Sequence, residues 1–154
     1  TEAEVFSDHP LVFIAAPEHP LAKRKALACA ALTSETLLIR ETGSGTRSAL
    51  ERYLQEQSVE FTKHIEMASN ETIKQAVMAN MGIAFISAHT IGLELSVGRL
   101  VVLRVTGTPL MRQWRVVHRK DKRLLPAAEL FRQFMRDEGA KLSAAHTAST
   151  PKRR

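Results

Sequence analysis

The segment LLIRETGSGTR, residues 37–47, contains the pattern that decides the fold. Its apolar residues predict a short buried strand, the glycines and hydroxyls that follow predict a turn, and helical spacing of the next apolar residues predicts a helix over 45–57. The same order of strand and helix recurs over 61–81 and over 83–97. Alternating strands and helices are typical of an α/β domain, so we predict a mostly parallel sheet with helices on both faces.

Other segments extend this pattern in both directions. The apolar run at 11–16 predicts a strand that is buried on both faces, and further strands are expected at 100–105 and 111–118. Apolar residues at helical spacing predict a last helix over 126–141. The small, polar and basic residues from Ser143 onward predict a disordered tail.

Composition and charge restrict the function classes. The 154 residues, 44% of them hydrophobic, can form a sizeable core, and no apolar run approaches the roughly 20 residues of a transmembrane helix. The net charge of +6 is unevenly distributed, because residues 1–111 carry 10 Lys and Arg against 12 Asp and Glu. The single cysteine, Cys29, excludes an internal disulfide and favours a reducing compartment, so we expect a cytoplasmic protein.

The basic residues are concentrated in one stretch near the C-terminal end of the chain. They are Arg112, Arg115, Arg119, Lys120, Lys122 and Arg123, with Trp114 as the one aromatic residue among them. No helix-turn-helix, zinc-finger or RNP-like pattern accompanies them, so they do not predict a nucleic-acid-binding surface. A solvated strand end or a contact with a partner subunit explains them instead.

The turn within the opening segment is the first candidate binding site, formed by Thr42, Gly43, Ser44, Gly45, Thr46 and Arg47. Hydroxyl and N–H groups converge there at a helix N-terminus, and an arginine adds a bidentate donor, which suits a phosphate or a carboxylate. The spacing matches neither a P-loop nor a dinucleotide fingerprint. A turn that merely begins a helix explains the same residues.

A second helix start, with Ser69, Asn70 and Thr72, follows the next strand. Ligands of open α/β sheets bind beyond the carboxyl ends of strands, so the two helix starts could share one site, although ordinary capping explains the second. None of the six histidines has metal-ligand spacing, and no nucleophile elbow or apolar carboxylate pair is present. We therefore predict no metal site and no enzymatic activity.

Several short segments together resemble a known family. They are HPLA at 19–22, IRETGSGTR at 39–47, NETIKQAV at 70–77, GIAFIS at 82–87 and VHRKDKR at 117–123. In this order the chain resembles the C-terminal part of a LysR-type transcriptional regulator from about Asp8 to Leu142, and within that family it is most similar to regulators of Calvin-cycle (RuBisCO) operons. One departure is that Asn80 and Met81 precede Gly82 where the family often has an earlier glycine, which we expect to alter a helix end.

The resemblance implies an effector domain of two Rossmann-like lobes, similar to periplasmic binding proteins of type 2. Residues 1–12 would be a strand that crosses from the first lobe, 13–118 the second lobe, 119–142 a return segment with the last helix, and 143–154 the tail. DNA contact would belong to an N-terminal region outside this sequence. The regulators self-associate, and we expect a second copy of the chain to cover the last helix.

The resemblance also implies a small anionic effector between the lobes, a phosphorylated metabolite or NADPH, with no cofactor. Its site would include the turn 42–47 and the helix start at 69–72, and the resemblance adds Ser87 and His89. Two alternatives remain open at this point. One is a lobe of a solute-binding protein that captures an anion for transport, and the other is a phosphate-handling enzyme that uses Arg47 and His89.

Overall fold

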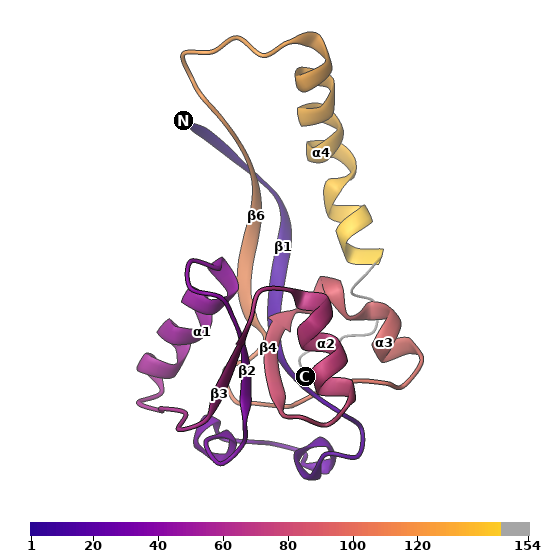
Figure 1. Ribbon diagram of the computed structural model, residues 1–154. Helices are drawn as coiled ribbons and strands as arrows, with labels where there is room; N and C mark the ends of the chain where they lie inside the picture. The colour runs from indigo at the N-terminus through magenta and orange to yellow at the C-terminus, as the bar shows by residue number, and fades with distance from the viewer. Residues whose placement is uncertain (146–154) are drawn as a thin grey trace.

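The computed structural model describes residues 1–145 and contains one six-stranded mixed sheet with helices on both faces (Figure 1). The strands are β1 (Glu2–Ala15), β2 (Leu37–Arg40), β3 (His64–Met67), β4 (Ile83–Ser87), β5 (Val101–Val102) and β6 (Leu110–His118). Their order is β3-β2-β4-β1-β5, and β6 also pairs with β1. β2 is parallel to β3 and β4, whereas β1 is antiparallel to β4, β5 and β6. The predicted parallel part is present, and the mixed character comes from β1 alone, which runs against the other strands.

The second half of β1 lies at the centre of the core. Its residues from Leu11 to Ala15 are buried, and successive side chains point to opposite faces of the sheet. Phe13 packs on one face among residues that include Tyr53 of α1 (Gly45–Glu56). Ile14 packs on the other face with α2 (Asn70–Met78). This double burial confirms the strand predicted from the apolar run.

Short helices complete the covering of the sheet. They are the 3-10 turns Pro20–Lys23, Cys29–Leu32 and Ala88–Thr90, and the single-turn helix α3 (Gly92–Ser96). The thiol of Cys29 is buried in the core, and this burial raises its pKa. A buried thiol with a raised pKa is a poor nucleophile, so Cys29 contributes to packing.

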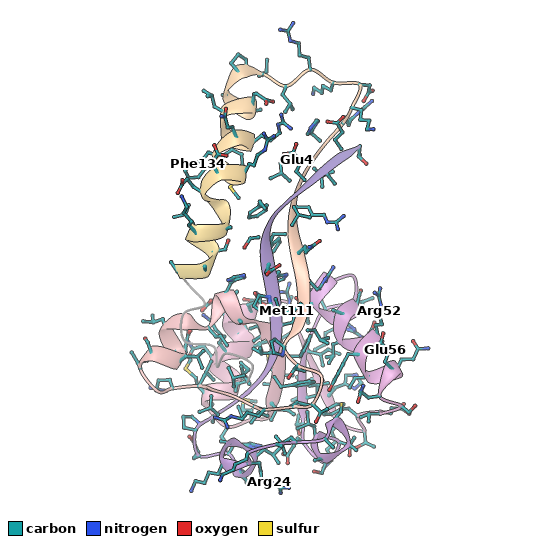
Figure 2. The ribbon with its side chains drawn as sticks, turned by 180° about the vertical axis from the view of Figure 1, so that it is seen from behind. Glu4, Arg24, Arg52, Glu56, Met111 and Phe134 are labelled. Atoms are coloured by element: carbon teal, nitrogen blue, oxygen red, sulfur yellow. The ribbon has the colours of Figure 1, made fainter. Side chains whose placement is uncertain are left out.

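The first half of β1 leaves this core together with β6. The two strands pair from Glu2 opposite His118 to Leu11 opposite Leu110, and the ribbon that they form extends beyond the sheet. Helix α4 (Pro126–Ala145) runs back alongside it (Figure 1). We call residues 2–8 and 111–145 the arm and residues 9–110 the lobe. Figure 2 shows Glu4 and Phe134 on the arm, and Arg52 and Glu56 on α1 of the lobe.

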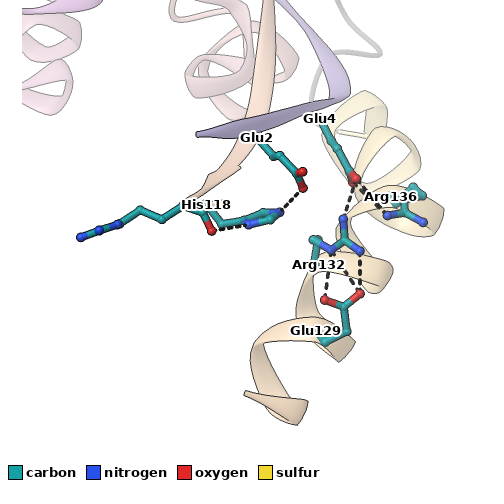
Figure 3. Close-up of polar contacts among 7 residues, drawn as sticks. Glu2, Glu4, His118, Glu129, Arg132 and Arg136 are labelled. Carbon is teal, nitrogen blue, oxygen red and sulfur yellow. Dashed lines mark hydrogen bonds and ion pairs between the residues drawn. The ribbon is translucent and has the colours of Figure 1, made fainter. Parts of the chain in front are cut away.

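Helix α4 is held to the ribbon by one close packing contact and by ion pairs. Gly139 of α4 is buried against the ring of Phe6, where a larger side chain would not fit. Glu4 accepts hydrogen bonds from Arg132 at 2.6 Å and from Arg136 at 3.0 Å, and Arg132 also binds Glu129 (Figure 3). These contacts hold α4 to the outer part of β1.

Four of the boundaries that differ from the sequence predictions have a physical explanation. β1 begins at Glu2 instead of Leu11, because its polar outer half is held by backbone pairing with β6 and needs no apolar pattern. β5 has two residues, since Val105 makes only an isolated bridge to Leu27. Helix α4 continues to Ala145, so residues 143–145 are helical where we expected the tail, and residues 146–154 lie outside the described part of the chain.

The fourth difference concerns the end of α2. The helix ends at Met78, and Asn80 takes the left-handed conformation, with a φ of 57°, that glycine commonly adopts after a helix. Gly82 is required for another reason, because a Cβ atom there would collide with the backbone of Thr36. Asn80, one of the two residues at which the chain departs from the family pattern, therefore lies just beyond the end of α2.

Candidate functional site

Three loops lie at one edge of the sheet, where the parallel strands β2, β3 and β4 end. The loop after β2 begins α1, the loop after β3 begins α2, and the segment after β4 leads through Ala88–Thr90 to α3. Figure 1 shows that the ribbon of β1 and β6 rises from this same edge. The shared edge that the sequence predicted is therefore present.

The start of α1 offers unsatisfied backbone donors. Gly43 has a φ of 93°, and Ser44 is the N-cap residue, but its side chain makes no capping hydrogen bond. The N–H groups of Gly45 and Thr46, in the first turn, have no partner within the helix. Thr42, on the preceding turn, is exposed. An anion could accept hydrogen bonds from this turn, as predicted.

Arg47 is already paired with carboxylates. Its Nε atom lies 2.8 Å from Glu51, and its Nη1 atom lies 2.5 Å from Glu66 and 3.2 Å from the carbonyl oxygen of Arg40. These hydrogen bonds raise its pKa. Where we expected a ligand for an anion, the structure places a guanidinium that joins β3 to α1.

The start of α2 is an ordinary capped helix with one addition. Ser69 is extended, and its hydroxyl oxygen accepts a hydrogen bond from the N–H group of Glu71 at 3.2 Å, which confirms the predicted N-cap. Thr72 is exposed on the first turn. The addition is that the side-chain oxygen of Asn70 accepts a hydrogen bond from Arg40 at 2.7 Å.

Arg40 joins the two helix starts, and the sequence analysis did not identify it. Its Nε and Nη2 atoms bind the carboxylate of Glu41 at 2.7 and 2.8 Å, while its Nη1 atom binds Asn70. Hydrogen bonding between Arg40 and Glu41 raises the pKa of the guanidinium and lowers that of the carboxyl group. Arg40 is the last residue of β2, and that position at a carboxyl strand end was the available signal.

Ser87 and His89 lie at this edge but bind β1. Ser87 is buried, with its hydroxyl 2.8 Å from Nε2 of His9, and it also caps the N–H group of His89 at 3.3 Å. The Nε2 atom of His89 lies 2.9 Å from the carbonyl oxygen of Asp8. The structure therefore gives both residues partners within the protein where we expected contacts with an effector.

His9 forms the centre of this cluster. Its ring stacks on Trp114 at a centroid distance of 4.3 Å and lies parallel to His89 at 5.8 Å. Burial, followed by the charges of His89 and Arg112, lowers the pKa of His9 from 6.5 to about 4. The imidazole is therefore neutral at pH 7. The sequence placed neither His9 nor Trp114 at the site, because their meeting depends on the register of β1 with β6.

Arg112 is a second cation that the sequence analysis did not assign to the site. It lies opposite His9 in the ribbon, and its Nη1 atom donates a hydrogen bond of 2.6 Å to the carbonyl oxygen of Gly45. It therefore connects the ribbon to the first turn of α1. The basic stretch thus supplies one residue that contacts the candidate site.

Two features are not found within residues 1–145. No group of His, Cys, Asp or Glu within that range could hold a metal ion. Within the same range, no helix is both long and apolar enough to cross a membrane.

The fold defines a class of protein: an α/β lobe of the architecture in which small molecules bind at the carboxyl ends of the parallel strands. Residues 1–140 match the LysR substrate binding domain family. The chain belongs to this family.

Curated relatives agree with this assignment. The chain is 49% identical over 141 residues to the RuBisCO operon transcriptional regulator of Allochromatium vinosum, and the alignment covers 92% of this chain and 47% of the relative. It is 51% identical over 140 residues to the HTH-type transcriptional regulator CbbR of Sinorhizobium medicae, and this alignment covers 90% of this chain and 45% of the relative. The chain therefore spans about half the length of these transcriptional regulators.

Solved structures show the same fold. The regulatory domain of CcmR from Synechocystis, in complex with 2-PG, superimposes with a TM-score of 0.83 at 33% identity, over 98% of this chain and 69% of that one. The effector binding domain of QuiR with shikimate superimposes with a TM-score of 0.76 at 18% identity, over 94% of this chain and 66% of that one. The periplasmic-binding-protein-like fold expected from the sequence is confirmed.

Proposed function

We propose that this chain is the second effector-domain lobe of a LysR-type regulator that controls carbon-fixation genes, including a RuBisCO operon, in response to a small phosphorylated metabolite. The observation that carries this proposal is the convergence of the α1 and α2 starts at one edge of the sheet. Two helix N-termini favour a compact anion, because unsatisfied N–H groups and the helix dipoles act together. The curated relatives are transcriptional regulators, which favours this function over a transport protein or an enzyme.

The chemistry of the effector is inferred from the site and from a relative. CcmR binds 2-PG, which is 2-phosphoglycolate, a small phosphorylated anion. The exposed turn at 42–46 and the α2 start at 70–72 are the parts of this chain that we assign to such a ligand. NADPH is a second candidate effector, and its phosphates could use the same donors. We assign no cofactor and no catalytic role to the domain.

The arm connects this lobe to the rest of the regulator in our proposal. Residues 1–12 and the segment 119–142 lead to a first lobe, which would cover the exposed side chains of α4, including Leu130 and Phe131. DNA would bind to an N-terminal region outside this chain, and the regulator would act as a dimer or tetramer in the cytoplasm. The lengths of the curated relatives leave room for both regions.

The test is ligand-dependent thermal stability of the two-lobe effector domain. We would compare 2-phosphoglycolate, ribulose bisphosphate, phosphoenolpyruvate and NADPH, with inorganic sulfate as a control for nonspecific anion effects. A ligand at about 100 times its Kd adds about 2.7 kcal/mol to the free energy of unfolding, which raises Tm by several degrees. If none of the four raises Tm above the sulfate control, the phosphorylated effector is contradicted.

A further inference from the structure

The guanidinium of Arg40 occupies the point where the two helix starts meet, and its surroundings are fixed. Arg40 is the last residue of β2, and its backbone is held by pairing with Met67 of β3. The side chain is 20% exposed, and all three of its nitrogen atoms have partners. Its position is therefore defined before any ligand arrives, as a recognition residue requires.

The two partners of Arg40 differ in how easily they could be replaced. Asn70 is neutral, and its backbone belongs to the first turn of α2, so its hydrogen bond can persist beside a ligand. Glu41 is charged, and its side chain is 36% exposed. An exposed ion pair contributes little to stability, so losing the contact with Glu41 costs the fold little.

The charges near Arg40 make this replacement specific. Glu41 neutralises Arg40, Arg47 is neutralised by Glu51 and Glu66, and Arg112 donates to the carbonyl oxygen of Gly45. An anion that approaches without displacing a carboxylate would meet three arginines whose charge these three carboxylates balance. A ligand with two negative charges gains more from the planar, bidentate donors of Arg40 than a single carboxylate does.

We propose that Arg40 is the residue that recognises the phosphoryl group of the effector, and that Glu41 is an internal counter-ion which the effector displaces. Asn70 keeps the guanidinium in place during the exchange. This inference rests on the proposed function and adds the residue that determines selectivity. It follows that a doubly charged phosphate ester binds much more tightly than a monocarboxylate of similar size, which only replaces one carboxylate by another.

The experiment measures the Kd of 2-phosphoglycolate by calorimetry on the full-length regulator, with glycolate as the probe that lacks the phosphoryl group. Arg40→Gln should weaken binding of 2-phosphoglycolate by about 10-fold to 100-fold, as expected when a charge-assisted bidentate pair is lost. Arg40→Lys keeps the charge without the planar fork and should lose less. Glu41→Gln should strengthen binding by several fold, because the internal competitor is gone.

Arg52→Gln is the matched control, since Arg52 is an exposed arginine on α1 and should leave the Kd within about 2-fold. Ligand-free melting curves show whether each variant is folded. If the unmodified regulator binds none of the four phosphorylated compounds, the proposed function fails. If it binds 2-phosphoglycolate and Arg40→Gln binds equally well, only this inference is overturned. Weaker binding by Glu41→Gln would also overturn it, because Glu41 would then contribute to the site.

Discussion

The lobe and the arm differ in how far their large apolar side chains are buried. In the lobe, Phe13 and Phe85 are almost completely buried between α1 and the sheet. On the arm, Val117, Phe131 and Phe134 are 58, 60 and 47% exposed. The lobe thus closes a core of its own, whereas the arm is held by strand pairing, one glycine contact and ion pairs. Exposed apolar side chains gathered on the arm are typical of a contact surface.

The largest difference in the free energy of unfolding should appear when one phenylalanine is removed from each region. The Phe13 ring lies 4.9 Å from Phe85 and 6.0 Å from Tyr53, so Phe13→Ala leaves a cavity and lowers the free energy of unfolding by about 3–5 kcal/mol. Phe131→Ala removes an exposed side chain and should change it by less than about 0.5 kcal/mol. Urea denaturation of this chain measures both values.

If Phe13→Ala does not fold, Phe13→Leu provides the same comparison at a smaller cost, since it conserves most of the volume. If the two alanine variants lose the same free energy of unfolding, the arm is as well packed as the lobe.

The second comparison concerns ion pairs. In the lobe, the Lys74 ammonium lies 2.7 Å from Glu94 and donates to the carbonyl oxygen of Thr90 at 3.0 Å, with both charged side chains largely buried. Lys74→Met leaves the Glu94 carboxylate buried without its partner and should cost about 3 kcal/mol. On the arm, Arg132→Met breaks the more exposed pair with Glu4 and should cost much less.

The double variant Lys74→Met with Glu94→Leu is the control for this comparison. It removes both charges and should recover much of the lost stability, because the unpaired carboxylate is the cause of the loss. A similar cost for Lys74→Met and Arg132→Met in urea denaturation would contradict the contrast between buried and exposed pairs.

The third prediction concerns His9, which joins the two regions by contacting Ser87 in the lobe and stacking on Trp114 of the arm. Its pKa is about 4 in the folded protein and 6.5 in the unfolded chain. Between these values the unfolded chain binds a proton that the folded protein does not. The free energy of unfolding should therefore fall as the pH drops from about 6.5 to about 4, by about 2 kcal/mol from this residue.

Urea denaturation at pH 7 and pH 4.5 measures this effect, with His9→Gln compared to the parent chain. The variant should lose less stability on acidification than the parent. His64→Gln is the matched control, because His64 is exposed on β3 and should leave the acid loss unchanged. The same acid loss in His9→Gln and the parent would exclude His9 as its source.

Sequence analysis predicted what depends on neighbouring residues and missed what depends on register. The order of strands and helices and the Ser69 cap follow from local patterns, and they are present. The contact of Arg40 with Asn70 joins residues 30 positions apart, and that of Arg112 with Gly45 joins residues 67 apart. No local pattern contains these pairs, because they arise only when the strands align.

The predicted role of Arg47 shows the same limit. Its place in a turn at a helix start predicted an anion ligand, but Glu66 from the neighbouring strand β3 pairs with it. The apolar pattern did not mark the outer half of β1, which only the family resemblance implied, since its residues alternate without an apolar face and are held by β6. Which charges pair across a sheet depends on which strands are neighbours and which of their residues lie side by side. The local pattern of one sequence does not specify this register.

The last prediction concerns self-association of this chain. It should change stability the least, and it tests the arm most directly. Exposed Phe131 and Phe134 lie one helical turn apart on α4, so two copies can cover each other's apolar faces. Sedimentation velocity should show association that increases with concentration, and Phe131→Glu with Phe134→Glu should abolish it. Leu93→Glu, at a 72% exposed position in the lobe, is the control and should leave association unchanged. A monodisperse monomer at every concentration would contradict the association, and loss of association in Leu93→Glu would place the contact on the lobe instead of the arm.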